Sequence, residues 1–192
     1  KKFLIFAISI TLFFSSFSKL YSIEPDVFVQ STVNRASKVL SGNFSKEVKI
    51  EKLKSIAEET VDIDILGLYT LGSHRKILNN DQKKEYKILF RKYFLKSFSS
   101  RLAEYSNPEI QVNSKKQISK NYTIVSSSLV ATEKRPEVKI DWRIYTKDPE
   151  NPLIRDLIIE GLSLARTQKE EFSSIIQSND NDINALFENL RE

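Results

Sequence analysis

The sequence contains no cysteine, a single histidine and only four glycines. Without cysteine it can form neither disulfide bonds nor thiolate metal sites, and we expect no lipid-anchored cysteine. A single histidine, His74, rules out a metal centre built from several histidines. The glycines are too few for a glycine-rich loop that cradles phosphate groups. The usual signs of a metal or nucleotide enzyme are therefore missing, and we expect no cofactor.

The amino-terminal segment, residues 1–22, has the layout of a secretory signal peptide. It begins with two lysines, continues with an apolar run from Phe3 to about Phe17, and ends in small serines. The run is shorter than the roughly 20 apolar residues that a membrane-spanning helix needs. We predict a signal peptide over residues 1–22 and a single exported domain over residues 23–192. An uncleaved membrane anchor is the alternative.

Cleavage would also leave the protein almost neutral. The formal net charge of the sequence is +5, and loss of Lys1, Lys2 and Lys19 lowers it to +2. A nearly neutral protein has no electrostatic reason to bind nucleic acid, so we expect no nucleic-acid partner. The remaining basic segments, such as Lys115–Lys116, are best interpreted as solvated faces.

The first half of the exported domain carries the pattern of α-helices. Apolar residues recur at helical spacing from Pro25 to a break at Gly42–Asn43, and a second helix is predicted over about residues 46–59. Asp62 or Asp64 is placed to cap a short third helix. Acid–base chemistry is the alternative for this pair, but no histidine or cysteine lies nearby in the sequence to act with it.

A long helix is predicted from the polar start Asn79–Asp81 to about Tyr105. Its apolar residues recur three or four positions apart, and many of them are aromatic. Such a face suits an ordinary helix packed on a core, and it also suits the wall of a cavity. The two interpretations are compatible.

Beyond Pro108 the sequence changes to the pattern of β-strands. Apolar and charged residues alternate cleanly along residues 138–145, which places Trp142 at the centre of an apolar face. Short turns join the strands into an antiparallel meander, and helices follow over about 163–177 and 181–190. The sequence thus predicts one α+β domain with helices first, about four strands, and helices packed back onto the sheet. The predicted strands cover residues 110–112, 122–131, 138–145 and 154–164.

The last predicted strand, Ile154–Leu164, organises this arrangement because it is rich in isoleucine and leucine throughout. We expect it to bend at Gly161, where glycine suits a bulge, and to continue into the following helix. A strand that is apolar on both faces must be covered on both. The cover is either a layer of helices or something that is not protein.

Several motifs in this order resemble the MlaC family of periplasmic phospholipid-binding proteins, also called toluene-tolerance proteins. The resemblance covers essentially the whole chain after the predicted signal peptide. It implies an apolar cavity between the sheet and the helices that holds acyl chains and leaves the headgroup largely outside. The matching motifs are Pro25-Phe28-Val29, Val61-Asp62, Leu71-Gly72, Gln82 with the spaced aromatic residues that follow it, and the segment Asp156–Phe172.

The resemblance also implies a function and partners. The protein would be a monomeric, non-catalytic carrier in the periplasm. It would move phospholipid between an outer-membrane lipoprotein complex and an inner-membrane ABC transporter, and so maintain outer-membrane lipid asymmetry. Small Ser127 in mid-strand would leave room for the chains. The expected acyl-chain-binding residues are Phe90, Phe94, Phe98, Tyr105, Val125, Ser127, Leu129, Ile140, Trp142, Ile144, Leu157, Ile159 and Leu162.

Two other classes of function remain open from the residues alone. A small enzyme could use a pocket of similar shape on an apolar substrate, and a structural envelope protein would have no cavity. Catalysis near neutral pH needs a suitable proton donor or acceptor. His74 lies in a polar, loop-like run, and Asp156 and Glu160 are better suited to an ion pair or a helix cap.

Overall fold

A computed structural model describes residues 22–133 and 135–192. The predicted signal peptide, apart from Ser22, lies outside the described residues. Within them the chain forms six α-helices, one short 3-10 helix (η1) and five strands. In chain order these are α1 (Pro25–Ser41), α2 (Lys46–Thr60), α3 (Ile63–Thr70), η1 (Gly72–Lys76), α4 (Asn80–Leu102), β1 (Ile110–Ser119), β2 (Tyr122–Leu129), β3 (Val138–Tyr145), β4 (Leu153–Ile159), β5 (Leu162–Ser163), α5 (Leu164–Gln177) and α6 (Ile183–Arg191).

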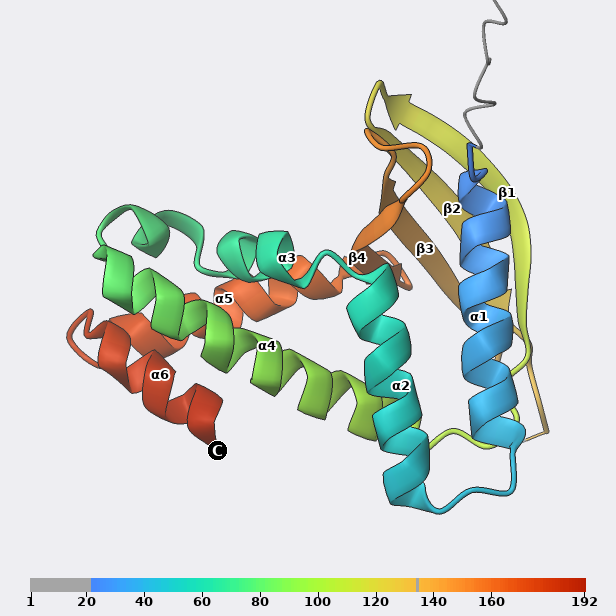
Figure 1. Ribbon diagram of the computed structural model, residues 1–192, viewed down its shortest axis with the longest axis horizontal. Coiled ribbons are helices and arrows are strands. Elements are labelled where there is room, and N and C mark those ends of the chain that lie inside the picture. Colours follow the sequence, from blue (N-terminus) through green and yellow to red (C-terminus); the bar gives the residue numbers. More distant parts are fainter. Residues whose placement is uncertain (1–21, 134) are drawn as a thin grey trace, which may run out of the picture.

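The strands form one antiparallel sheet in the order β1-β2-β3-β4-β5. Helix α1 lies across one face of this sheet, over β1 and β2 (Figure 1). Helices α3 to α6 form a separate bundle beside β4. Helix α2 stands between the two halves and contacts both α1 and α4. The predicted α+β class is confirmed, with an antiparallel meander that follows one group of helices along the chain and precedes another.

No helix in the described ranges has both the length and the apolar character that a membrane crossing requires.

The sheet differs from the prediction at both of its edges. The first strand runs over Ile110–Ser119 rather than 110–112, and it was hard to recognise because its side chains beyond Val112 are exposed on both faces. At the other edge the predicted bend at Gly161 is wrong. The chain reverses there through Glu160 and Gly161, with φ angles of 50° and 82°. Both residues adopt the left-handed backbone conformation and form a tight hairpin turn. Strand β4 therefore ends at Ile159, and β5 is a fifth strand.

Side-chain caps fix where the helices begin. Asp62 Oδ1 accepts a hydrogen bond from the Ile65 amide at 3.4 Å, as predicted for α3. Asn79 and Gln82 form a reciprocal capping box at the start of α4. Asp156 accepts from the Ser163 hydroxyl at 2.6 Å, and it accepts from the first-turn amide of α5 at 3.1 Å. Asp156 therefore anchors a helix start, as the preferred interpretation of this residue predicts.

The apolar side chains form two separate cores. The helical core is built by the residues of α2 to α6 and their connections, and the sheet core is built by α1 and one face of the sheet. Val61 packs against both of them. The helical core contains Ala57, Ile63, Leu71, Leu78, Tyr86, Phe90, Leu95, Phe172, Ile176, Leu186, Phe187 and Leu190. The sheet core contains Val29, Val33, Val125, Leu129, Ile140, Trp142, Ile144 and Ile154.

Polar contacts join these two halves at the turn between α2 and α3. The Asp62 amide donates to the Ile154 carbonyl of β4 at 2.9 Å. The Asp62 carboxylate accepts from Arg155 Nε at 2.9 Å and pairs with Arg155 Nη2 at 2.8 Å. The Arg155 guanidinium lies over the Tyr145 ring at 3.4 Å and donates to the Tyr122 hydroxyl at 2.7 Å. This mostly buried cluster orients the helical bundle relative to the sheet.

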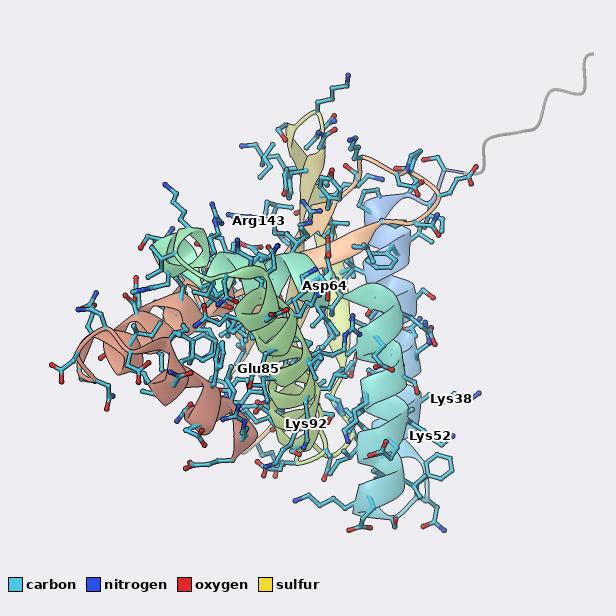
Figure 2. The ribbon with its side chains drawn as sticks, turned by 60° about the vertical axis from the view of Figure 1, so that its left-hand side comes forward. Lys38, Lys52, Asp64, Glu85, Lys92 and Arg143 are labelled. Atoms are coloured by element: carbon cyan, nitrogen blue, oxygen red, sulfur yellow. The ribbon has the colours of Figure 1, made fainter. Side chains whose placement is uncertain are left out.

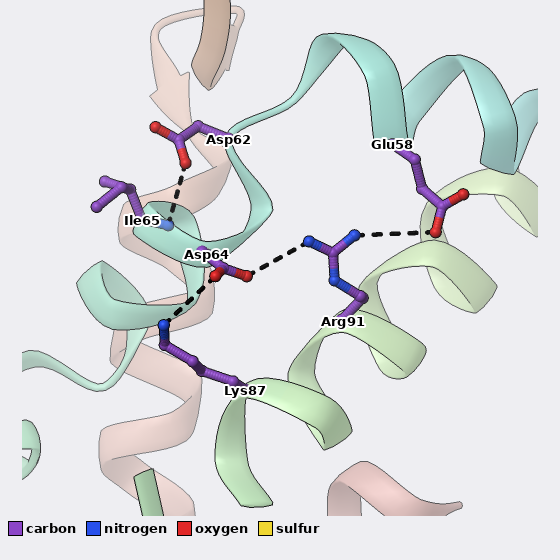
Figure 3. Close-up of polar contacts among 6 residues, drawn as sticks. All are labelled: Glu58, Asp62, Asp64, Ile65, Lys87 and Arg91. Atoms are coloured by element: carbon purple, nitrogen blue, oxygen red, sulfur yellow. Dashed lines mark hydrogen bonds and ion pairs between the residues drawn. The ribbon is translucent and has the colours of Figure 1, made fainter. Parts of the chain in front are cut away.

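A second, exposed set of ion pairs braces the same turn, as Figure 3 shows. Arg91 of α4 lies 3.8 Å from Glu58 of α2 and 3.4 Å from Asp64 of α3. Lys87 reaches Asp64 at 3.3 Å. Because these side chains are about half exposed, each pair contributes only about 0.2–1 kcal/mol.

Replacing Tyr86 by phenylalanine should lower the free energy of unfolding near neutral pH. The same change should reduce the loss of stability that the protein shows at alkaline pH. The buried Tyr86 hydroxyl lies 2.9 Å from Thr70 Oγ1 and donates to the Gly67 carbonyl at 3.1 Å. Loss of these contacts should cost about 1 kcal/mol. Burial also raises the pKa of Tyr86. In the unfolded chain the phenol ionises near its ordinary pKa of about 10, so its stabilising effect is present below that pH and lost above it.

Urea unfolding near neutral pH and at about pH 11 measures both effects. Tyr86→Phe should be less stable than the wild type near neutrality and should lose less stability on going to the alkaline pH. Tyr69→Phe, which alters an exposed tyrosine, is the control and should match the wild type near neutrality. Equal alkaline losses in the wild type and Tyr86→Phe would contradict the assignment.

Arg155→Met should destabilise the protein by about 2 kcal/mol, because it leaves the mostly buried Asp62 carboxylate without its partner. The double variant Asp62→Asn/Arg155→Met should lose clearly less than the sum of the two single variants. Arg91→Met, in the exposed set of ion pairs, is the matched control and should cost at most about 0.5 kcal/mol. Denaturant unfolding gives all four values, and strict additivity would show that the pair contributes nothing.

Candidate functional site

The candidate residues of the sheet come together as rows across one face. Residues that lie directly opposite each other in neighbouring strands point to the same side of a sheet. One row therefore runs from Ser127 through Ile140 and Ile159 to Leu162, across β2, β3, β4 and β5. A second row joins Val125, Trp142 and Leu157. We call this side of the sheet the apolar face.

The apolar face is covered at one end and open at the other. Val125 and Ile144 are completely buried, and Val29 and Val33 of α1 pack with them in the sheet core. Along the first row, Ile140 is 9% exposed, Ile159 is half-buried and Leu162 is 69% exposed. The cover thus ends towards β4 and β5, which agrees with the position of α1 over β1 and β2 (Figure 1).

Ser127 makes two hydrogen bonds within the sheet. Its hydroxyl accepts a hydrogen bond from Trp142 Nε1 at 2.8 Å, and the room that this small side chain would leave for acyl chains stays a prediction. The same hydroxyl donates to the Ile140 carbonyl at 3.1 Å. A buried indole N–H needs such a partner. Ser127 is therefore the group that lets the single tryptophan lie on the apolar face without an unsatisfied donor.

The aromatic residues of α4 belong to the helical core rather than to the apolar face. The rings of Phe90 and Phe94 stack at 6.1 Å, and those of Phe94 and Phe98 stack at 5.4 Å. Phe90 is buried against Phe172 of α5, whereas Phe94 and Phe98 are half-buried. Tyr105 lies beyond the end of α4, and the Arg135 guanidinium lies 5.8 Å from its ring. Phe90, Phe94 and Phe98 therefore lie in or against the helical core, and Tyr105 belongs to neither core.

Sequence reasoning missed the contribution of α1. Val29 and Val33 are four residues apart and form part of the sheet core, and the half-buried Phe28 packs against it. Their helical spacing is visible in the sequence. The sequence does not show which helix covers which face, because that depends on contacts between residues about 100 positions apart.

The charged residues fit a structural or solvated role. Lys38 and Lys52 point outward from α1 and α2 (Figure 2). Lys115 instead pairs with Glu24 and Asp26, whose contacts raise the pKa of its ammonium group. Hydrogen bonding to Lys115 correspondingly lowers the pKa of Asp26.

The groups that could support catalysis are dispersed. His74 lies in η1, in the helical half and away from the sheet (Figure 1). The side chain of Glu160 accepts from the Lys139 amide, and Asp156 anchors α5. Among the described residues, no cluster of histidine, cysteine, aspartate or glutamate could hold a metal ion.

Two shallow hollows on the described surface lie away from the apolar face. One, of about 460 Å³, lies over the turn between β3 and β4, and it is lined by Tyr145, Lys147, Asp148, Pro149 and Glu150. The other, of about 480 Å³, lies on α5 and is lined by Glu170, Ser173, Ser174, Gln177 and Ser178. Neither hollow contains a candidate acyl-chain residue.

Comparisons with known proteins identify the family. Among solved structures, the chain is similar to a phospholipid-binding protein from Ralstonia solanacearum that was determined in complex with a phospholipid. The two share 17% sequence identity with a TM-score of 0.72, over 88% of this chain and 96% of that one, which shows a common fold. No curated protein sequence gives a significant match. The family model of the MlaC protein matches residues 30–192, and the chain therefore belongs to the MlaC family.

Proposed function

We propose that the protein is a phospholipid carrier that holds acyl chains against the apolar face of its sheet. The observation that carries this proposal is the continuous apolar row from buried Ile140 through half-buried Ile159 to exposed Leu162. Membership of the MlaC family and the shared fold with a phospholipid-bound protein support the same ligand class.

The chemistry of the apolar face suits hydrocarbon. Each methylene group that leaves water contributes roughly 0.8 kcal/mol, so a carrier gains most from a surface without free polar groups. The indole N–H of Trp142 is already bonded to Ser127, and the Ser127 hydroxyl is bonded to the backbone. Acyl chains lying on this face would displace no hydrogen bond made by these groups.

The place and partners of the carrier follow from the same proposal. We assign the protein to the periplasm, after export by residues 1–22, and give it a shuttle role between outer-membrane and inner-membrane complexes. The signal-peptide layout of the sequence and the MlaC family match support this assignment. The carrier acts by binding alone, since Asp156 and Glu160 are engaged in structural contacts and His74 lies in the other half.

Gently purified protein should release phospholipid on organic extraction, in a nearly stoichiometric amount. Phospholipids with brominated acyl chains should quench the fluorescence of Trp142, the single tryptophan, because bromine quenches an indole only at close contact. The same lipids without bromine are the control and should not quench. Absence of extractable lipid together with absence of quenching would refute the carrier role.

Leu157→Trp should reduce the amount of bound phospholipid and leave the melting temperature of the lipid-free protein nearly unchanged. Leu157 is only half-buried at the open end of the apolar face, so an added ring can occupy space that an acyl chain would take. Leu129→Trp is the matched control in the covered end, where overpacking should cost about 1–3 kcal/mol. Native mass spectrometry and thermal unfolding report the two effects. Strong destabilisation by Leu157→Trp with unchanged lipid content would make Leu157 an ordinary core residue.

A further inference from the structure

The two edges of the apolar face differ in chemistry. At the β1 edge, Lys115 points to this side because it lies opposite Val125, and its ammonium group pairs with Glu24 at 2.5 Å and with Asp26 at 2.8 Å. These ion pairs tie the start of α1 to the edge strand. Lys115 ends the row of Val125, whereas the row of Ser127 ends at the β1 edge with half-buried Val112, which packs against the sheet core. At the β5 edge, the row of Ser127 ends with Leu162, which lies opposite Ile159 and is 69% exposed.

The exposed leucine is held on a fixed support. The Glu160 amide donates to the Lys139 carbonyl at 3.0 Å, and the Glu160 carboxylate accepts from the Lys139 amide. These contacts tie the hairpin between β4 and β5 to β3. A Cβ atom built on Gly161 would meet nothing within 4 Å, so nothing packs against the hairpin at that point.

Exposure of one leucine on a protein surface is ordinary by itself. Leu162 differs because its neighbours in the row become steadily more buried, from Ile159 to Ile140, and lead to Trp142 on the next row. A hydrocarbon chain that contacts Leu162 can therefore move onto the buried part of the face without crossing a charged group of this row. At the β1 edge this row ends in Val112, which packs against the sheet core where α1 contacts β1, and the ion pairs of Lys115 on the next row hold the start of α1 there.

We propose that acyl chains reach the apolar face at its β4–β5 edge, with Leu162 as the first side chain that they contact. The proposal rests on the carrier function and adds its route of access. It assigns Leu162 and Ile159 to a portal, defined as the exposed end of the row, and it assigns the β1 edge to a closed side.

The absence of cysteine allows a direct test with single-cysteine variants of the full domain. Leu162→Cys carries an environment-sensitive fluorescent probe at the portal. Ile77→Cys is the matched control, because Ile77 is 73% exposed in the helical half, outside the sheet. Both labelled proteins are mixed with vesicles of phosphatidylethanolamine and phosphatidylglycerol. The probe at residue 162 should shift to the blue as lipid is taken up, and the probe at residue 77 should not.

A kinetic experiment tests the same route without a label. Leu162→Lys places a charge at the portal and should slow the uptake of brominated phospholipid about tenfold. Quenching of Trp142 fluorescence reports the uptake rate. Ile77→Lys is the control and should take up lipid at the wild-type rate. Circular dichroism checks that both variants are folded. Wild-type uptake by Leu162→Lys, or a probe shift at residue 162 without quenching of Trp142, would overturn the portal. Failure of the wild type to quench at all would instead refute the carrier function.

Discussion

The buried contact between Asp62 and Arg155 is the constraint on which the arrangement of the two halves depends. Asp62 ends the connection from α2, caps α3 and donates its amide to β4, while Arg155 fixes the carboxylate from the strand side. Arg155 is in turn held by Tyr122 and Tyr145. An ion pair with several hydrogen bonds fixes distance and angle, whereas apolar contacts are not directional. One short segment thus positions a helical bundle against a sheet while the two cores remain separate.

That separation has a physical consequence for the candidate site. If both halves shared one close-packed core, the apolar face would be filled by side chains, because protein interiors leave few voids. Instead, α1 covers only the β1–β2 end, and the bundle is attached at the edge of β4. The end of the face near β5 remains uncovered, and Leu162 is exposed there. Polar contacts at the junction therefore allow an apolar surface to persist in a folded protein.

Much of this architecture could be predicted from local sequence, and the rest depends on contacts that no local pattern records. The alternation around Trp142 predicts its face, and Asp62 and Asn79 predict their helix starts, because period and capping act over a few residues. The reversal after Ile159 was missed because it places Glu160, a residue without special turn preference, at positive φ. The spacing of the α4 aromatics predicted that Phe90 would face a core or a cavity wall, and the structure places its ring against Phe172 of α5. Helical spacing predicts that such a residue is buried, and it does not say against what.

The bond between Ser127 and Trp142 sets a limit on what the apolar face can recognise. Because the indole donor is satisfied from within the sheet, the face offers an acyl chain shape and hydrocarbon contact rather than hydrogen bonds. Selection there can act on the length and bulk of chains, since each methylene contributes a similar increment. In the proposed carrier, selection among headgroups would have to come from polar groups at the proposed portal, where the Glu160 carboxylate is already engaged with the Lys139 amide. On the proposed function, the carrier would therefore discriminate little between headgroups and hold its cargo mainly by the chains.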